Sequence, residues 1–240
     1  MDKMSHLVGL PRFDLRKECI VIPVYNNPET VFKVVESALE SAADVIVVDD
    51  GSSPSVEIKI DSKRLHMLCH GANAGKGEAI LTGAKKAKEL GYGSFFVVDA
   101  DGQHFAHEIE NFAGADVDNC IVIGCRRFGE NVPGSSRFGR KFSNFWIKTE
   151  TGLSLDDTQS GFRSYPVSIL NLDLKKKRYD FEIEVLVKHA WSGGCIEEVE
   201  IGVHYPKAGE RVSHFHAFKD NLRLTRLHST LVFRRWLGLK

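Results

Sequence analysis

The 240-residue sequence predicts an α/β fold in which a mostly parallel central sheet is flanked by helices. Short runs rich in β-branched residues alternate with longer stretches of helical periodicity, which is typical of parallel strands joined by helices. Polar segments follow the ends of several apolar runs, as they do at the carboxyl edge of such a sheet. The length suits one large domain with a substantial core.

In the first half, the strands and helices can be assigned from periodicity. Five apolar runs are expected to be strands, at residues 19–24, 45–48, 65–69, 95–98 and 121–123. Pro28 can open a helix over 28–43, because apolar residues recur there at helical spacing. A second helix is expected over 77–90, and Gly91 should end it.

In the second half, the pattern changes. We expect a Gly-, Pro- and Ser-rich loop at 129–136, an amphipathic helix at 137–151, a polar loop at 155–161, a helix at 181–191, a strand at 196–205 and a helical tail at 215–239. The predicted organisation is therefore an N-terminal extension (1–17), one α/β domain (18–206) and a basic amphipathic tail (207–240).

Composition excludes several classes of protein. The 32 Lys and Arg balance the 32 Asp and Glu, so no overall positive charge favours nucleic acid. Five cysteines are scattered without a Cys-x-x-Cys pair, and we expect them to be small core residues in a reducing compartment. Neither a signal peptide nor a membrane-spanning run is visible, so a cytoplasmic location is expected.

An acidic turn is the most informative feature. Asp99 and Asp101 stand one residue apart where an apolar run ends, and Gly102 allows a sharp turn that brings Gln103 or His104 toward the same point. Such oxygen ligands suit Mg²⁺ or Mn²⁺ held together with a diphosphate. The alternative interpretation is a polar turn that only ends a strand.

Two further polar loops should lie at the same edge of the sheet. Tyr25 follows the first strand and could stack on a base, while Asp49 and Asp50 follow the second and could accept hydrogen bonds from a nucleoside. The segment from Gly71 to Gly77 is not a P-loop, because its glycines are too close together and no Ser or Thr follows Lys76. It is better interpreted as a Gly-rich loop that opens a helix near phosphate.

Taken in order, the motifs P-V-Y-N, V-D-D-G-S, N-A-G-K-G, D-A-D-G-Q-H, G-C-R-R and D-T-Q-S-G-F-R resemble those of family 2 glycosyltransferases with the GT-A fold. The similarity is greatest to the branch of dolichyl-phosphate mannose synthase and bacterial polyprenyl-phosphate sugar transferases, and it covers about residues 17–206. It implies an inverting transfer from a nucleotide-diphosphate sugar. Asp99, Asp101 and Gln103 would then hold the metal, and Asp157 would lie near the acceptor.

The remaining candidate residues follow from the resemblance together with the chemistry of the transfer, in which Lys and Arg stabilise the departing diphosphate. The nucleotide would be bound by Pro23, Tyr25, Asn27, Asp49, Asp50, Lys76 and Asp99, and the diphosphate or acceptor phosphate by Arg126, Arg127, Arg137, Arg140 and Ser160. Asp101 and Asp157 would take part in catalysis. A hydroxyl acceptor needs a base, for which Asp157 is the candidate, whereas an ionised phosphate needs none. Asn27 departs from the Glu that many lipid-phosphate transferases carry there.

The expected function is the transfer of one sugar from a UDP- or GDP-sugar to a lipid-linked acceptor such as polyprenyl phosphate. The alternatives are a protein that binds nucleotide sugars without transferring them, and a transferase that acts on a hydroxyl acceptor. The basic apolar tail could lie on a membrane, pack on its own domain or form an oligomer contact. A nucleotidyltransferase is disfavoured, since no Gly-rich loop with Arg and Lys follows the first strand.

Overall fold

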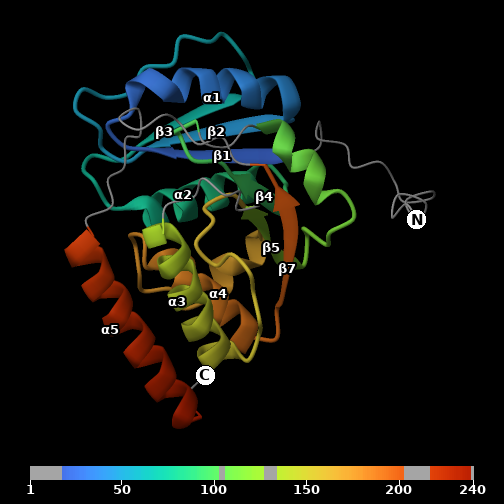
Figure 1. The fold of residues 1–240 in the computed structure, drawn as a ribbon. Coiled ribbons are helices and arrows are strands. Elements are labelled where there is room, and N and C mark those ends of the chain that lie inside the picture. The colour runs from blue at the N-terminus through green and yellow to red at the C-terminus, as the bar shows by residue number, and fades with distance from the viewer. Residues whose placement is uncertain (1–17, 103–105, 127–133, 203–216, 239–240) are drawn as a thin grey trace.

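The computed structural model describes residues 18–102, 106–126, 134–202 and 217–238, apart from the side chains of 106–107, 134–138 and 217–222. Its centre is a seven-stranded sheet with the strand order β3-β2-β1-β4-β6-β5-β7 (Figure 1). The strands are β1 (Cys19–Val24), β2 (Asp44–Asp49), β3 (Leu65–Cys69), β4 (Ser94–Val97), β5 (Cys120–Arg126), β6 (Arg163–Pro166) and β7 (Cys195–Ile201).

All neighbouring strands are parallel except those that pair with β6. β6 runs antiparallel to both β4 and β5, with Arg163 opposite Val97 on one side and Ile123 on the other. The start of β6 therefore lies at the carboxyl end of β4 and beside the middle of β5. The prediction of a mostly parallel α/β sheet is confirmed, but β6 was not predicted, because its sequence R-S-Y-P lacks an apolar alternation.

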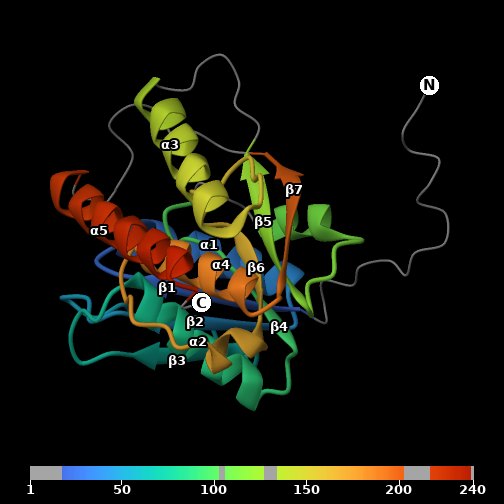
Figure 2. The same cartoon turned by 90° about the horizontal axis from the view of Figure 1, so that it is seen from below.

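Helices cover both faces of the sheet (Figures 1 and 2). They are α1 (Pro28–Ser41), α2 (Lys76–Glu89), α3 (Gly134–Thr151), α4 (Phe181–Trp191), α5 (Ala217–Trp236) and the short 3-10 helices η3 (Ala106–Phe112) and η4 (Val167–Asn171). One core lies between the sheet and α1 with η3. The second lies on the opposite face beneath α2, α4 and the inner sides of α3 and α5.

The predicted helices are present, with shifted boundaries. α3 begins at Gly134, within the segment expected to be a loop. The prediction placed the start of the helix too late, because Gly and Ser have low helix propensity. The strand expected over 196–205 is β7, and residues 203–205 lie outside the described part of the chain. Among the described residues, no helix is both long and apolar enough to cross a membrane.

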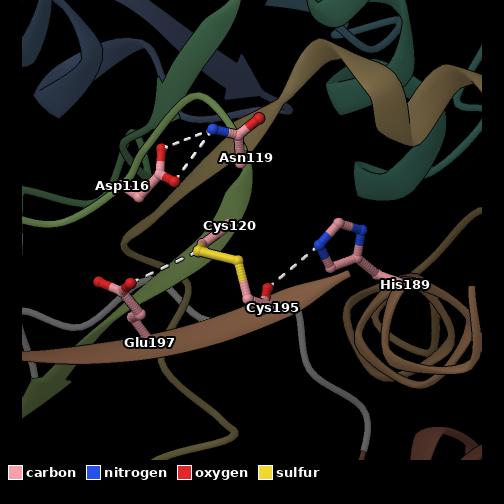
Figure 3. Close-up of a disulfide and its surroundings, with 6 residues drawn as sticks. All are labelled: Asp116, Asn119, Cys120, His189, Cys195 and Glu197. Carbon is pink, nitrogen blue, oxygen red and sulfur yellow. Dashed lines mark hydrogen bonds between the residues drawn. A yellow bond between two sulfur atoms is a disulfide. The ribbon is translucent and has the colours of Figure 1, made fainter. Parts of the chain in front are cut away.

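The expectation that the five cysteines are small core residues in a reducing compartment holds for the burial of Cys19, but it is wrong for the others. Cys69 is exposed, Cys125 is only partly buried, and the remaining two are paired. Cys120 and Cys195 form a disulfide that joins the first residue pair of the β5–β7 ladder (Figure 3). Their separation of 75 residues in the chain concealed the pairing, since it depends on strand register. His189 donates a hydrogen bond to the carbonyl oxygen of Cys195 at 3.1 Å.

The helical tail packs on its own domain. Leu227 and Leu231 are buried against the second core. Nδ1 of His228 lies 2.7 Å from Oε1 of the buried Glu150 on α3, and its ring stacks on Trp146 with 5.5 Å between centroids. Of the three uses considered for the tail, packing on the same chain therefore accounts for the inner side of α5.

Candidate functional site

The acidic turn follows β4 at the carboxyl edge of the sheet. Ala100 is buried between Asp99 and Asp101, which are both partly exposed, and Gly102 has a φ of +72° that L side chains rarely adopt. The carbonyl oxygen of Ala100 accepts hydrogen bonds from Asn27 and Thr30 at the start of α1. Asn27 thus positions the acidic turn, a role that the sequence did not indicate.

Lys76 joins the acidic turn to α4. Its ammonium lies 2.7 Å from Oδ1 of Asp99 and 3.0 Å from Oε1 of Glu182. Burial acts to lower the pKa of Lys76, but the two carboxylates outweigh it and hold that pKa above its ordinary value. Lys76 is therefore a fixed positive charge at the carboxyl edge, where a diphosphate would bring negative charge.

Gly161 brings a third segment against this ion pair. A Cβ added there would lie 2.6 Å from Oδ2 of Asp99 and 2.9 Å from Nζ of Lys76. The loop before β6 therefore passes directly over the acidic turn. Because β6 starts at the carboxyl edge, the loop that contains Asp157 and Ser160 belongs to the same site as Asp99.

The two aspartates at the end of β2, Asp49 and Asp50, are buried and already accept several hydrogen bonds. Asp49 accepts from the backbone of Ser52 and Val56 and from the hydroxyl of Ser55. Burial acts to raise the pKa of Asp49, but these hydrogen bonds lower it below its ordinary value. Asp49 therefore stabilises the conformation of the loop after β2.

Asp50 holds the Gly-rich loop in the same way. It accepts backbone hydrogen bonds from Ala74 at 2.9 Å and Gly75 at 2.8 Å, and it lies 2.8 Å from Nδ1 of His70. The loop thereby places Lys76 at the first position of α2. Pro23 lies within β1 and half-buried Tyr25 just after it, at the same edge.

On the other side of the site, Asp157 forms a bidentate ion pair with Arg126 at the end of β5. Nε and Nη2 of Arg126 lie 2.6 and 2.9 Å from the two carboxylate oxygens, and Nη1 of Arg140 lies 3.8 Å away. Asp157 is fully buried. Burial acts to raise its pKa, but the guanidinium of Arg126 brings the pKa below its ordinary value.

Two residues without a role in the sequence analysis hold the loop of Asp157 in place. Glu198 on β7 accepts the backbone N–H groups of Asp156 and Asp157. Fully buried Arg163 donates to the carbonyl oxygens of Thr158, Ser160 and Glu182. Arg163 ends the quoted D-T-Q-S-G-F-R motif, so its presence was visible. No local pattern pointed to Glu182 or Glu198, because their partners are distant in the chain.

Some predicted positions cannot be placed. Gln103 and Arg127 lie outside the described residues, and for Arg137 only the backbone in α3 is described. Ser160 is fully buried, and its hydroxyl oxygen has no hydrogen-bond partner among the described residues. In the described part of the chain, no three His, Cys, Asp or Glu side chains gather as a metal site.

The donor set nevertheless fits a magnesium or manganese ion. Both ions take one or two carboxylates together with water and phosphate oxygens, rather than a complete set of protein ligands. Asp99 and Asp101 supply two carboxylates of the right chemistry at the carboxyl edge. The cofactor prediction therefore stays compatible with these residues.

Comparison with known proteins gives the family and the fold. Residues 19–177 match the model of Glycosyl transferase family 2. The chain is 29% identical to UDP-N-acetylglucosamine–dolichyl-phosphate N-acetylglucosaminyltransferase from Methanococcus voltae, covering 70% of this chain and 78% of that protein. It is 28% identical to polyprenol monophosphomannose synthase from Mycolicibacterium smegmatis, covering 78% and 77%.

Among solved structures, glucosyl-3-phosphoglycerate synthase from Mycobacterium tuberculosis in complex with phosphoglyceric acid has a TM-score of 0.61. The identity is 18%, and the match covers 92% of this chain and 80% of that one. The same synthase in complex with Mg²⁺ and uridine diphosphate has a TM-score of 0.59 at 17% identity, covering 92% and 79%. At this level of identity, the likeness supports a GT-A-like fold.

Proposed function

Because the chain belongs to glycosyl transferase family 2, we propose that it moves a single sugar, with inversion, from a UDP- or GDP-sugar to a lipid-linked phosphate such as a polyprenyl phosphate. Two relatives are named for transfer to a dolichyl phosphate and for the synthesis of a polyprenol monophosphomannose. The finer statement, that this chain uses a phosphate acceptor, rests on the Asp157–Arg126 pair.

That pair is the observation that carries the proposal. A hydroxyl acceptor must lose a proton to a base, and Asp157 was the candidate. A fully buried carboxylate with a lowered pKa and a bidentate guanidinium partner is a poor proton acceptor. An ionised phosphate acceptor needs no base, so this arrangement suits it better. Asp157 then serves to hold Arg126 at the end of β5.

The residues on the donor side have matching tasks. Breaking the bond between the sugar and the diphosphate leaves negative charge on the departing group, which a cation must stabilise. Lys76 provides one such charge at the edge of the sheet. A divalent metal, held by Asp99 and Asp101, would neutralise the rest of the diphosphate.

The test compares two acceptors of the same chain length, a short polyprenyl phosphate and the corresponding polyprenol, with a panel of UDP- and GDP-sugars and Mn²⁺. We expect product from the phosphate only, and none after chelation of the metal. Asp99→Asn and Asp101→Asn should each lose at least about 10²-fold in kcat/KM. Asp116→Asn, which removes an exposed carboxylate before β5, is the matched control.

Product from the polyprenol, but not from its phosphate, would contradict the proposed acceptor class. Binding of nucleotide sugars without transfer to either acceptor would instead favour the alternative of a non-catalytic binding protein. Full activity of both aspartate variants would remove the metal from the proposal.

A further inference from the structure

Positive charge is concentrated on two helices of a chain whose overall charge is neutral. α3 and α5 together contain nine Lys and Arg against two Asp and Glu, whereas the whole chain has 32 of each kind. The rest of the protein is consequently acidic. A segregation of this size creates a directional field, which attracts an anionic partner to one side of the molecule.

The same two helices expose aromatic side chains. Phe142 and Phe145 on α3 are 43% and 61% exposed, and Phe233 and Trp236 on α5 are 62% and 81% exposed. Among the described residues, Phe32 on α1 is the one other aromatic side chain with such exposure. Each helix buries its inner side in the core, so these rings lie on the outer sides.

The two helices lie side by side, as both views of the fold show (Figures 1 and 2), and contacts between α3 and His228 of α5 join them. One stripe of α3 faces the loop of Asp157, because Arg140 and Asn144 both donate to the carbonyl oxygen of Asp156. The neighbouring stripe contains the exposed residues Lys141, Phe145 and Lys148. The outer face is thus adjacent to the proposed acceptor loop.

We propose that the outer sides of α3 and α5 form a docking surface for an anionic lipid bilayer. Aromatic rings partition into the headgroup region while Lys and Arg meet anionic headgroups, and this surface presents both in the same place. The inference stands on charge and exposure alone. One consequence rests on the proposed function as well: a lipid-linked phosphate in the same bilayer would lie near Arg126.

The test measures binding of the full chain to vesicles of phosphatidylcholine, with and without phosphatidylglycerol, by flotation. We expect binding only to the anionic vesicles, weakening as salt is raised. Lys148→Glu with Arg226→Glu should weaken binding by about ten-fold or more. The triple variant Phe145→Ser, Phe233→Ser and Trp236→Ser should weaken it similarly while the melting temperature is preserved, because these side chains are exposed.

Matched controls are available on the opposite layer. Phe32→Ser and Lys33→Glu remove an exposed ring and an exposed charge from α1, and both should bind vesicles like the unchanged protein. Failure to bind anionic vesicles, or equal binding by the triple variant, would overturn the inference. A dimer that the triple variant dissolves would assign the face to a second copy and would also overturn it. Sugar transfer to a water-soluble short-chain acceptor, measured separately, keeps this outcome distinct from failure of the proposed function.

Discussion

Substituting Gly161 by Ala tests whether the loop before β6 and the acidic turn form one site. The added Cβ would meet Oδ2 of Asp99 at 2.6 Å and Nζ of Lys76 at 2.9 Å, against an ordinary contact of at least 3.4 Å. Both are side-chain atoms, so the backbone can stay in place. The ion pair between Asp99 and Lys76 must give way instead.

The size of the effect follows from the displacement. Oδ2 of Asp99 must move by about 0.8 Å to restore ordinary contact, and a misplacement of about 1 Å at a reacting centre can cost about 10²-fold in rate. We therefore expect kcat/KM to fall about 10- to 100-fold, or about 1.4 to 2.7 kcal/mol of transition-state stabilisation. The cost to folding should be about 1 kcal/mol, the lower end for overpacking.

The assay is steady-state sugar transfer over a series of Mn²⁺ concentrations, combined with thermal unfolding. Gly139→Ala on α3 is the matched control, since its Cβ would contact the side chain of Gln159 at an ordinary 3.4 Å. It should retain activity. If Gly161→Ala transferred sugar at an unchanged rate and with unchanged dependence on Mn²⁺, the loop before β6 and the acidic turn would not form one site.

Two further predictions concern stability. Replacing Cys120 and Cys195 by Ser should lower the free energy of unfolding by about 4.5 kcal/mol in the chain-entropy model for a loop of 75 residues, as denaturant titration would measure. The unchanged protein, unfolded without reductant, should show three titratable thiols, and five thiols would refute the pairing. Asp157→Asn should cost about 3 kcal/mol at neutral pH, because it removes the buried carboxylate that pairs with the guanidinium of the partly buried Arg126. Since folding lowers the pKa of Asp157, its stabilisation is present above the unfolded pKa of about 3.9 and is lost as the pH falls through the folded pKa. The difference in melting temperature between the unchanged protein and Asp157→Asn should therefore shrink in acid. A difference that stays constant with pH would contradict the lowered pKa of Asp157.

Much of the fold could be predicted because its strands are apolar and its helices amphipathic. β1 and β2 are almost entirely buried, and their apolar sequences I-V-I-P-V and V-I-V-V indicate this burial. β6 escaped prediction because Arg163 and Ser164 are buried polar residues, whose place in a strand depends on partners elsewhere in the chain. The disulfide escaped for the same reason, as register is a property of the folded sheet.

Within the site, the sequence located the loops better than it located the tasks of their residues. Asp50 and Asp157 do lie at the carboxyl edge, yet each accepts several hydrogen bonds from the protein. Periodicity and motif spacing place a carboxylate near a ligand, but they do not reveal which backbone N–H groups it must satisfy first. Glu182 and Glu198 were missed because their partners, Lys76 and the loop of Asp157, are more than 40 residues away in the chain.

The reversed direction of β6 explains how one site can draw on both halves of the chain. Had β6 run parallel to its neighbours, Arg163 would enter the sheet at the amino edge, and the loop before it would lie a full strand length from Asp99. Running antiparallel, β6 starts opposite Val97 and delivers Gly161 onto the Asp99–Lys76 pair. Arg163 then ties that loop to α4 through the carbonyl oxygen of Glu182, whose carboxylate holds Lys76. A change on one side of this connection should therefore affect the other side. The effects of Gly161→Ala and Asp157→Asn on sugar transfer should then be non-additive, and additive effects in the double variant would disprove the connection.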